Sequence, residues 1–495
     1  MGPGLTGNAA CLSPRTMTDL RLFNSLTRGL ETFTPIRAGE ARVYSCGPTV
    51  YNYPHIGNMR AYVFADVLGR ALTFKGYKLT HVINITDVGH LTDDADAGED
   101  KLEKAAAATK QSIWDIAQHY TEAYWADVEA LNIRQPAHWS IATDYVPQMI
   151  EFAKGIAENH CYEIEGGLYF DVSTVTDYGR LARAVTDEGE GRINAVAGKR
   201  NAADFAIWRK TPAGETRQME WDSPWGRGAP GWHLECSVMG EALLGFPFDI
   251  HTGGIDHREI HHPNEIAQNQ AHIGCGDLGR SDASGANIWM HNNFLVDRTG
   301  KMSKSAGEFL RLPLLVAKGY HPLAYRLMCL QAHYRSELEF SWDGLGAALT
   351  RLKRMVMAAA ALRQAHDERA EEPKLADLLA RFEAAVSDDL NTPLALTVFE
   401  EALAAKKLNP RGQRAALARM DEVLGLRVLD LRREDLRLRP ADAGTSDDDI
   451  EAALTRRKDA RAARDFATSD AIRDELATQG VEVMDGDPLE WDWKL

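Results

Sequence analysis

The sequence Arg42-Val43-Tyr44-Ser45-Cys46 predicts a buried β-strand, and the residues that follow it indicate the fold class. Residues 59–74 place alanine and leucine at helical spacing, and residues 79–85 form a second apolar run with β-branched side chains. A strand, a helix and a second strand at these distances are typical of a βαβ unit. We therefore expect an α/β fold built on a Rossmann-like parallel sheet that binds a nucleotide.

The rest of the chain divides into segments of different character. Residues 248–251 and 288–291 are further short apolar runs that end in polar residues, where parallel sheets bind ligands. From Pro313 onward leucine and alanine recur three and four residues apart, which predicts a helical bundle. We expect the following units: a disordered leader at 1–18, a Rossmann-like domain at 19–312 with an insertion at about 114–208, the bundle at 313–430, a linker at 431–447 and a small mixed α/β unit at 448–495.

Composition excludes several classes of protein. The chain has 495 residues, 44% hydrophobic and 26% charged, which suits a globular protein of roughly three domains. No apolar run approaches the roughly 20 residues needed to cross a bilayer, and the start lacks a secretory signal pattern, so we expect a cytoplasmic protein that does not enter membranes. Six cysteines make no disulfide framework in so long a chain, which leaves thiols or metal ligands. The net charge of −16 counts against indiscriminate nucleic-acid binding.

The motif Pro54-His55-Ile56-Gly57-Asn58 stands between the first predicted strand and its helix. The free N–H groups and the positive dipole end of a helix N-terminus favour a phosphate at this place. His55 and Asn58 can donate hydrogen bonds to phosphate oxygens, and Gly57 leaves room for a nucleotide base beside the backbone. An ordinary strand-to-helix turn uses the same residue types, so this motif alone does not establish a nucleotide site.

A second motif, Lys301-Met302-Ser303-Lys304-Ser305, follows Gly300 on a predicted loop. Two lysines and two hydroxyls can close on a polyphosphate, and the lysines can stabilise the charge that develops on phosphoryl oxygens as pyrophosphate leaves. Such a loop is more often only exposed and flexible. The two motifs nevertheless fall on two halves of one predicted sheet, which favours a shared role.

Four residues far apart in the chain predict a zinc centre: Cys46, Cys236, His261 and Glu265. Thiolate, imidazole and carboxylate together suit a zinc ion. Each residue alone has an ordinary explanation, because cysteines are often simply buried and a His-x-x-x-Glu pair is often a helix-face contact. His257 and His262 are rival ligands that the sequence does not separate from His261.

These segments together resemble the cysteinyl-tRNA synthetase family of class I aminoacyl-tRNA synthetases, from about Asp19 to the C-terminus. The resemblance rests on these matching segments, which occur in a fixed order: Cys46-Gly47-Pro48-Thr49-Val50-Tyr51, residues 55–58, Asn84-Ile85-Thr86-Asp87, residues 231–236, Gly253-Gly254-Ile255-Asp256, residues 261–268, residues 301–305, Ala332-His333-Tyr334-Arg335-Ser336 and Asp389-Leu390-Asn391-Thr392-Pro393.

The resemblance implies an enzyme that activates L-cysteine with ATP and Mg²⁺ to cysteinyl-adenylate and pyrophosphate, then transfers cysteine to the terminal adenosine of cysteine tRNA. It implies one zinc, bound by the four residues above and completed by the substrate thiolate. The residues implied to contact the amino acid are Cys46, Gly47, Thr86 and Trp232, and those implied to contact ATP are His55, Gly57, Asn58, Gly254, Asp256, Lys301, Met302, Ser303, Lys304 and Ser305. Residues 313–430 and 448–495 would contact tRNA, and we expect a monomer.

One position departs from the family pattern. The class motif commonly ends His-Ile-Gly-His, whereas this chain has Asn58 in the fourth position. An amide still donates a hydrogen bond but does not become cationic, so we expect phosphate binding to persist without a titrating group there.

Zinc also offers an account of specificity. A pocket that reads shape separates cysteine from serine by only about 10 to 200-fold. A thiol, whose pKa is about 8.5, binds zinc as the thiolate far more readily than a serine hydroxyl does. We therefore expect no editing domain.

Two other functions remain open from the sequence. A cysteine ligase of the mycothiol pathway resembles the same catalytic domain but should lack the C-terminal units, and a catalytically silent RNA-binding paralogue should lack the ligands and lysines. This chain keeps those residues and continues with basic helices and a Trp491-Asp492-Trp493 end that suits stacking on bases. The sequence therefore favours the tRNA ligase.

Overall fold

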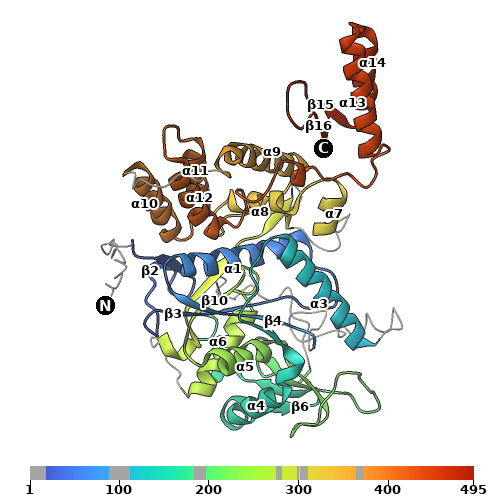
Figure 1. Cartoon of the computed structure of the whole chain (residues 1–495). Helices are drawn as coiled ribbons and strands as arrows, with labels where there is room; N and C mark the ends of the chain where they lie inside the picture. The colour runs from blue at the N-terminus through green and yellow to red at the C-terminus, as the bar shows by residue number, and fades with distance from the viewer. Residues whose placement is uncertain are drawn as a thin grey trace, which may run out of the picture.

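The computed structural model describes residues 18–88, 112–182, 197–274, 281–297, 300–301, 310–363 and 373–495. Residues 1–17 of the leader predicted at 1–18 and the residues Met302, Ser303, Lys304 and Ser305 lie outside the described residues. Figure 1 shows three parts: a parallel sheet with helices on both faces, a helical bundle next to the sheet's upper helix, and a small C-terminal unit that contacts the bundle through the Lys353–Asp492 ion pair.

A five-stranded sheet in the order β11-β10-β3-β4-β5 forms the centre of the first layer, and all its pairings are parallel. Its strands are β3 (Glu40–Ser45), β4 (Lys78–Ile85), β5 (His138–Ile141), β10 (Phe248–Gly254) and β11 (Ala286–Asn292). Their apolar residues are buried nearly without interruption, as expected for strands that are covered on both faces. The predicted Rossmann-like sheet is therefore confirmed.

Helices on both faces of the sheet bring the functional segments to one edge. In Figure 1, α1 (Ile56–Phe74) lies on one face, and α5 (Trp232–Leu244) and α6 (His261–Ile273) lie on the other. Short connections start α1 and α6 near the carboxyl ends of β3 and β10, where parallel sheets bind ligands. The Cys46 N–H donates to the Thr252 carbonyl over 3.0 Å, so β3 and β10 end together.

Between the two halves of the sheet, the chain adds peripheral elements. Helices α3 (Ile113–Ala130) and α4 (Val146–His160) flank β5, which joins the central sheet beside β4. A four-stranded antiparallel sheet follows, made of β6 (Cys161–Ile164), β7 (Gly167–Phe170), β8 (Phe205–Lys210) and β9 (Gly228–Pro230). Near the chain start, β1 (Arg21–Asn24) and β2 (Gly29–Thr32) form a hairpin.

After β11, a small three-stranded sheet leads into the bundle. Its strands are β12 (Leu295–Asp297), β13 (Gly300–Lys301) and β14 (Leu338–Glu339). The helices of this region are α7 (Leu312–Ala317), α8 (Pro322–Leu330), α9 (Trp342–Ala359), α10 (Pro373–Ser387), α11 (Thr392–Ala404) and α12 (Pro410–Leu424). Their leucines and alanines face one another in the core, so the predicted helical character of this region is confirmed.

A buried ion network joins the bundle to the sheet layer. Arg326 of α8 is fully buried and donates to the Asp66 carboxylate of α1 over 2.7 Å and to the Leu424 carbonyl over 2.7 Å. Burial alone would raise the pKa of Asp66, but Arg326 and Arg70 hold it below its ordinary value. Because removing one partner would leave a buried charge unpaired, this network fixes how α8 and α12 sit against α1.

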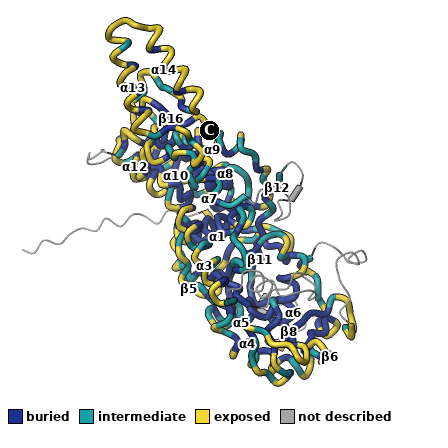
Figure 2. The backbone as a smooth tube through the Cα atoms, turned by 90° about the vertical axis from the view of Figure 1, so that its right-hand side faces the viewer, coloured by how far each residue is buried: buried dark blue, intermediate teal, exposed yellow. Residues whose placement is uncertain are grey.

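The C-terminal unit has a core of its own. It contains α13 (Asp447–Ala462), α14 (Phe466–Thr478), β15 (Val481–Val483) and β16 (Trp491–Trp493). Trp491 and Trp493 are only 2% and 5% exposed, because they pack against α13 and α14 as part of this core. The expectation that these tryptophans suit stacking on bases is therefore wrong. Figure 2 shows that the far ends of α13 and α14 are exposed instead.

Among the helices in the described ranges, none is both long and apolar enough to cross a membrane.

Candidate active site

A cavity of about 310 Å³ opens at the carboxyl edge of the central sheet. The predicted residues that line it are Cys46, Gly47, His55, Gly57, Asn58, Trp232, Gly254, Asp256 and His261. They come from the ends of β3 and β10 and from the first turns of α1, α5 and α6. The structure therefore places Cys46, at the end of β3, and the motif at residues 54–58 in the wall of one cavity.

The four predicted metal ligands meet at the inner end of this cavity. Suitable atoms of Cys46, Cys236, His261 and Glu265 all lie within 4.8 Å of one another, and all four side chains are buried. Cys236 comes from α5, whereas His261 and Glu265 project from successive turns of α6. This is the compact sulfur, nitrogen and oxygen donor set that a zinc ion accepts.

The electrostatics of the set also suit a cation. Its hydrogen bond with Cys46 lowers the pKa of Cys236 to about 6, whereas burial raises the pKa of Cys46. Burial opposes ionisation of Glu265, but His251 and His261 outweigh it and lower its pKa to about 2. Burial likewise disfavours charged His261, but Glu265 and Cys236 raise its pKa to about 10. His261 therefore carries a proton at the place where a metal would replace it.

An unsatisfied atom supports the same assignment. Within the described part of the chain, the buried Oε1 of Glu265 accepts no hydrogen bond of acceptable geometry, although His261 Nε2 lies 3.0 Å away. Its other oxygen, Oε2, bonds with His251 Nε2 over 2.8 Å. Protonated His261 forms an ion pair with Oε1 without good hydrogen-bond alignment, and a cation that replaced the proton would satisfy this buried oxygen. The residues present thus fit a divalent metal.

The structure narrows the choice between rival ligands without removing it. A second donor set, Cys46, His251, His262 and Glu265, meets the same distance criterion and shares two members with the first. His262, however, bonds with Cys46 Sγ over 3.3 Å and with His291 Nε2 over 2.8 Å. His257 belongs to neither set. The predicted set offers a substrate two donors that line the open cavity, Cys46 and His261, whereas the rival set offers only Cys46.

His55 and Asn58 form the N-terminal cap of α1. The Asn58 N–H donates to His55 Nδ1 over 3.1 Å, and the His55 N–H donates to Asn58 Oδ1 over 3.2 Å. Because Nδ1 is an acceptor here, neutral His55 carries its proton on Nε2. The amide nitrogen of Asn58 is likewise a donor. Both side chains line the cavity at the positive end of a 19-residue helix.

Two predicted glycines are required by close packing. A Cβ at Gly47 would lie 1.7 Å from the Asn84 carbonyl oxygen, and the Gly47 N–H donates to Asn84 Oδ1 over 2.7 Å. A Cβ at Gly254 would lie 2.5 Å from Asp256 Oδ1. A side chain at Gly47 would therefore push the backbone out of place at the cavity edge, whereas one at Gly254 would meet only the Asp256 side chain.

Thr86 lies behind the cavity wall. It is 2% exposed and is not among the residues that line the cavity. Its hydroxyl donates to Glu235 Oε2 over 2.9 Å and accepts from Asn84 Nδ2 over 3.0 Å. Trp232, in contrast, lines the cavity, with its ring centroid 4.3 Å from that of His261.

For the predicted phosphate loop, the structure describes only the beginning. Lys301 ends β13, which pairs with β12 through Val296. Met302, Ser303, Lys304 and Ser305 lie outside the described residues. Strand β12 begins at Leu295, which lines the cavity, so the backbone of Lys301, paired with Val296, lies next to the cavity wall.

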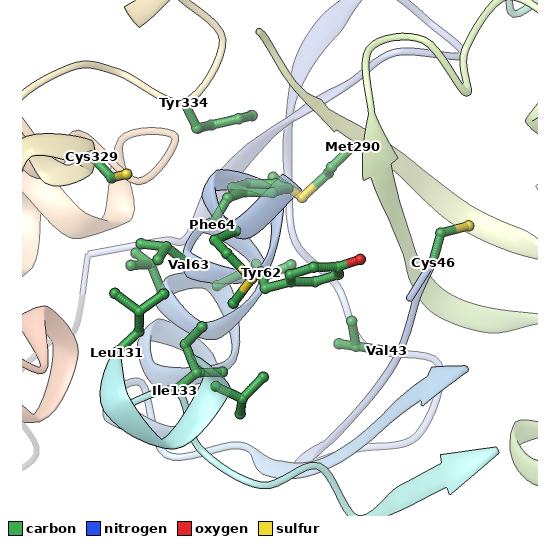
Figure 3. Close-up of a cluster of buried hydrophobic side chains, with 14 of the residues drawn as sticks. Val43, Cys46, Tyr62, Val63, Phe64, Leu131, Ile133, Met290, Cys329 and Tyr334 are labelled. Atoms are coloured by element: carbon green, nitrogen blue, oxygen red, sulfur yellow. The ribbon is translucent and has the colours of Figure 1, made fainter. Parts of the chain in front are cut away.

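Sequence reasoning missed part of the cavity wall. Tyr62 of α1 is one such residue, and Figure 3 shows its hydroxyl pointing toward the strand that carries Cys46. The end of β11, the two residues after it and the start of β12 supply four more: Asn292, Asn293, Phe294 and Leu295. The signal for these was present, because residues 288–291 form a buried run that ends in polar residues at the ligand-binding edge.

Comparisons with known families agree with this geometry. A model described as tRNA synthetases class I (C) catalytic domain matches residues 32–350. A second model, described as cysteinyl-tRNA ligase anticodon binding domain, matches residues 445–488. Among solved structures, a methionyl-tRNA synthetase from Mycobacterium tuberculosis has a TM-score of 0.51 at 15% identity, covering 78% of this chain and 90% of that chain. A leucyl-tRNA synthetase from Agrobacterium radiobacter has a TM-score of 0.56 at 13% identity, covering 82% and 85%. Likenesses this distant support the fold.

Curated relatives extend the match over the whole length. A cysteine–tRNA ligase from Novosphingobium aromaticivorans is 73% identical over 96% of this chain and 97% of its own length. One from Zymomonas mobilis is 53% identical over 95% of this chain and 97% of its own. With these identities, the class I catalytic match and the clustered metal ligands, the chain belongs to the cysteine–tRNA ligase family of class I aminoacyl-tRNA synthetases.

Proposed function

We propose that this chain activates L-cysteine with ATP and Mg²⁺ to cysteinyl-adenylate and pyrophosphate, then transfers the cysteinyl group to the 3′-terminal adenosine of cysteine tRNA. One observation carries the proposal: Cys46 and His261 of the buried Cys46, Cys236, His261 and Glu265 set line the same cavity as the capped N-terminus of α1. If the substrate sulfur were bound at the cysteine, histidine and glutamate set and a phosphate of ATP at the α1 N-terminus, the carboxylate of the amino acid would lie between these two sites.

In this proposal one zinc ion is held by Cys46, Cys236, His261 and Glu265. A zinc ion in such a site binds the sulfur of an incoming cysteine as the thiolate, which a serine hydroxyl does not match. The protein supplies the donor arrangement, and His251 supports it by holding Glu265 in place through its other oxygen.

His55 and Asn58 act on ATP. Activation joins a carboxylate oxygen of cysteine to the α-phosphorus and releases pyrophosphate, so negative charge develops on the phosphate oxygens. Donors fixed at a helix N-terminus stabilise that charge without reorganising. The remaining ATP contacts in the proposal are Gly57, Gly254, Asp256, Lys301, Met302, Ser303, Lys304 and Ser305.

Cysteine itself would contact Cys46, Gly47 and Trp232 directly. Thr86 would act through position rather than contact, because its hydroxyl joins Glu235 to Asn84, and Asn84 holds Gly47. This chain of hydrogen bonds supports the edge of the amino-acid pocket next to the metal.

The tRNA would be bound by the helical region at 313–430 and the unit at 448–495, joined by the linker at 431–447. The anticodon-binding match at residues 445–488 supports this arrangement. Phe466, at the start of α14, is 60% exposed, which suits stacking on a base. Several residues of the basic helices form ion pairs within the protein, including Arg351 with Glu400 and Lys353 with Asp492. We propose that the enzyme works as a monomer in the cytoplasm.

The test is cysteine-dependent exchange of pyrophosphate into ATP, followed by charging of cysteine tRNA. Both reactions should occur, and a chelator that removes the metal should abolish exchange. Exchange without charging would favour a cysteine ligase for another acceptor, and absence of exchange in metal-replete protein would favour a silent paralogue.

A further inference from the structure

Two segments that resemble the family but carry no assigned role meet at one buried carboxylate. Asp389, between α10 and α11, is 2% exposed. Its Oδ1 accepts from the Tyr334 hydroxyl over 2.6 Å and from the Phe23 N–H over 2.8 Å. Its Oδ2 accepts from Arg335 Nε over 2.7 Å. The Asp389 side chain therefore links the helical bundle to residues 334–335 and to Phe23 of β1.

The backbone at this point is held in an uncommon conformation. Asp389 and Leu390 have φ values of 55° each, in the left-handed region that non-glycine residues seldom occupy. The Asp389 N–H donates to the Arg21 carbonyl over 2.9 Å, which helps to hold the turn. Such strain persists only where the surroundings determine it, and it is often found where a functional arrangement depends on it.

From Asp389 the contacts continue to α1, the helix whose N-terminus borders the cavity. The Tyr334 ring stacks on Phe64 of α1 with centroids 4.5 Å apart, and Figure 3 shows the two side by side. Burial, and to a smaller extent the charge of Asp389, raises the pKa of Tyr334. Its hydroxyl therefore keeps its proton and donates a hydrogen bond. The bundle turn is thus joined to α1 by one aromatic residue.

The same segment holds the cavity wall. Arg60 of α1 is buried and donates to the carbonyls of Asn293, Phe294 and Ser336. The Asn293 N–H donates to the Tyr334 carbonyl over 2.8 Å, and β12 pairs with β14, which begins just after Ser336. Asn293 and Phe294 line the same cavity as His55 and Asn58, and these hydrogen bonds join them to residues 334–336.

We propose that Asp389 is a positioning residue for ATP: through Tyr334 and Arg335 it sets the Asn292–Leu295 wall and strand β12 relative to the α1 N-terminus. The inference rests on the proposed ATP site. The cysteine side of the cavity is built from β3, α5 and α6, and within the described ranges the hydrogen-bond partners of Asp389 named above belong to neither metal-donor set. Loosening the Asp389 cluster should therefore disturb ATP more than cysteine.

The test is steady-state pyrophosphate exchange by Asp389→Asn in the full-length, metal-replete protein. Asparagine also tolerates positive φ, so the variant removes charge and one acceptor without adding backbone strain. We expect kcat to fall about tenfold and KM for ATP to rise about fivefold, because a small misplacement of reacting groups is costly. KM for cysteine and metal content should stay within about twofold of wild type. Asp388→Asn is the matched control, since Asp388 is exposed and its ion pair with Arg21 spans 3.7 Å.

The outcomes separate this inference from the proposed function. The positioning role would be overturned if KM for ATP and KM for cysteine rose equally, or if a folded Asp389→Asn variant kept the kinetic values of the wild type. In either case, pyrophosphate exchange by the wild-type protein would still support the proposed ligase. If Asp389→Asn does not fold, Tyr334→Phe removes only the hydroxyl that donates to Asp389 and must raise KM for ATP selectively. A Tyr334→Phe variant with unchanged ATP kinetics would also overturn it.

Discussion

Asn58 and His55 bond to each other in both directions at the start of α1, through Asn58 N to His55 Nδ1 at 3.1 Å and His55 N to Asn58 Oδ1 at 3.2 Å. The amide that replaces the usual histidine of the class motif therefore has a structural reason to be there. It caps the helix through its oxygen and keeps its nitrogen as a donor toward the cavity.

Replacing Asn58 by aspartate should separate these two tasks. The carboxylate keeps the acceptor for the His55 N–H but places negative charge where phosphate binds. We expect KM for ATP in pyrophosphate exchange to rise at least about tenfold, with little loss of thermal stability. Asn58→His, which restores the usual class residue, serves as the control and should stay within about threefold of wild type. A normal KM for ATP in the Asn58→Asp variant would contradict a phosphate at this helix end.

Cys236→Ser should separate cysteine binding from ATP binding. Loss of one thiolate removes a metal ligand, so metal content should fall and kcat/KM for cysteine should drop at least about 100-fold. ATP affinity, measured by calorimetry or a fluorescent analogue, should change little because Cys236 is away from the helix N-terminus. Cys161→Ser is the control, since that half-buried thiol lies in β6 of the peripheral sheet. Unchanged exchange by Cys236→Ser would remove Cys236 from the site.

The stability of the protein should depend on pH through Asp127. Burial on α3 raises the pKa of Asp127 to about 7, and Arg311 offsets only part of this. The unfolded chain releases this proton near pH ~4, so the folded state binds more protons between about pH 4 and pH 7, and stability falls as pH rises through that range.

Asp127→Asn should remove that loss. Relative to wild type, the thermal midpoint of the variant should be about 2–4 °C more favourable at pH 8 than at pH 5. Glu129→Gln, on an exposed position of the same helix, should show no such difference. If Asp127→Asn changed the thermal midpoint equally at pH 5 and pH 8, the result would contradict the raised pKa of Asp127.

Phe466→Ala tests the proposed anticodon contact. Removing an exposed stacking platform should raise KM for cysteine tRNA by about 5 to 100-fold, the range expected for the loss of one stacked base. Pyrophosphate exchange, which needs no tRNA, should be unchanged. Trp114→Ala, at a side chain 47% exposed on α3 and outside the regions proposed to bind tRNA, is the matched control. Equal charging by the two variants would place the anticodon elsewhere.

Much of the fold could be read from local patterns. The runs at residues 42–46, 79–85, 248–251 and 288–291 are buried strands because the sheet is covered on both faces, so periodicity and composition sufficed. The clustering of the four predicted metal ligands could also be anticipated, because each stands at a strand end or on the first turns of a helix, and such ends converge in parallel sheets.

Other features depended on tertiary context. Trp491 and Trp493 pack into a core that only the pairing of β15 with β16 creates, so an aromatic-rich end alone pointed to base stacking. The second donor set with His251 arises because β10 lies next to α6, which no local spacing reveals. Thr86 matched a motif, yet its hydroxyl faces Glu235 behind the cavity wall.

The most direct test is the ratio of kcat/KM for cysteine to that for serine in pyrophosphate exchange, measured together with zinc content. Selection by a metal-bound thiolate predicts one zinc per chain and a ratio well above the roughly 200-fold that a shape-reading pocket achieves. Full activity with negligible zinc, or a serine rate within about tenfold of the cysteine rate, would contradict the account.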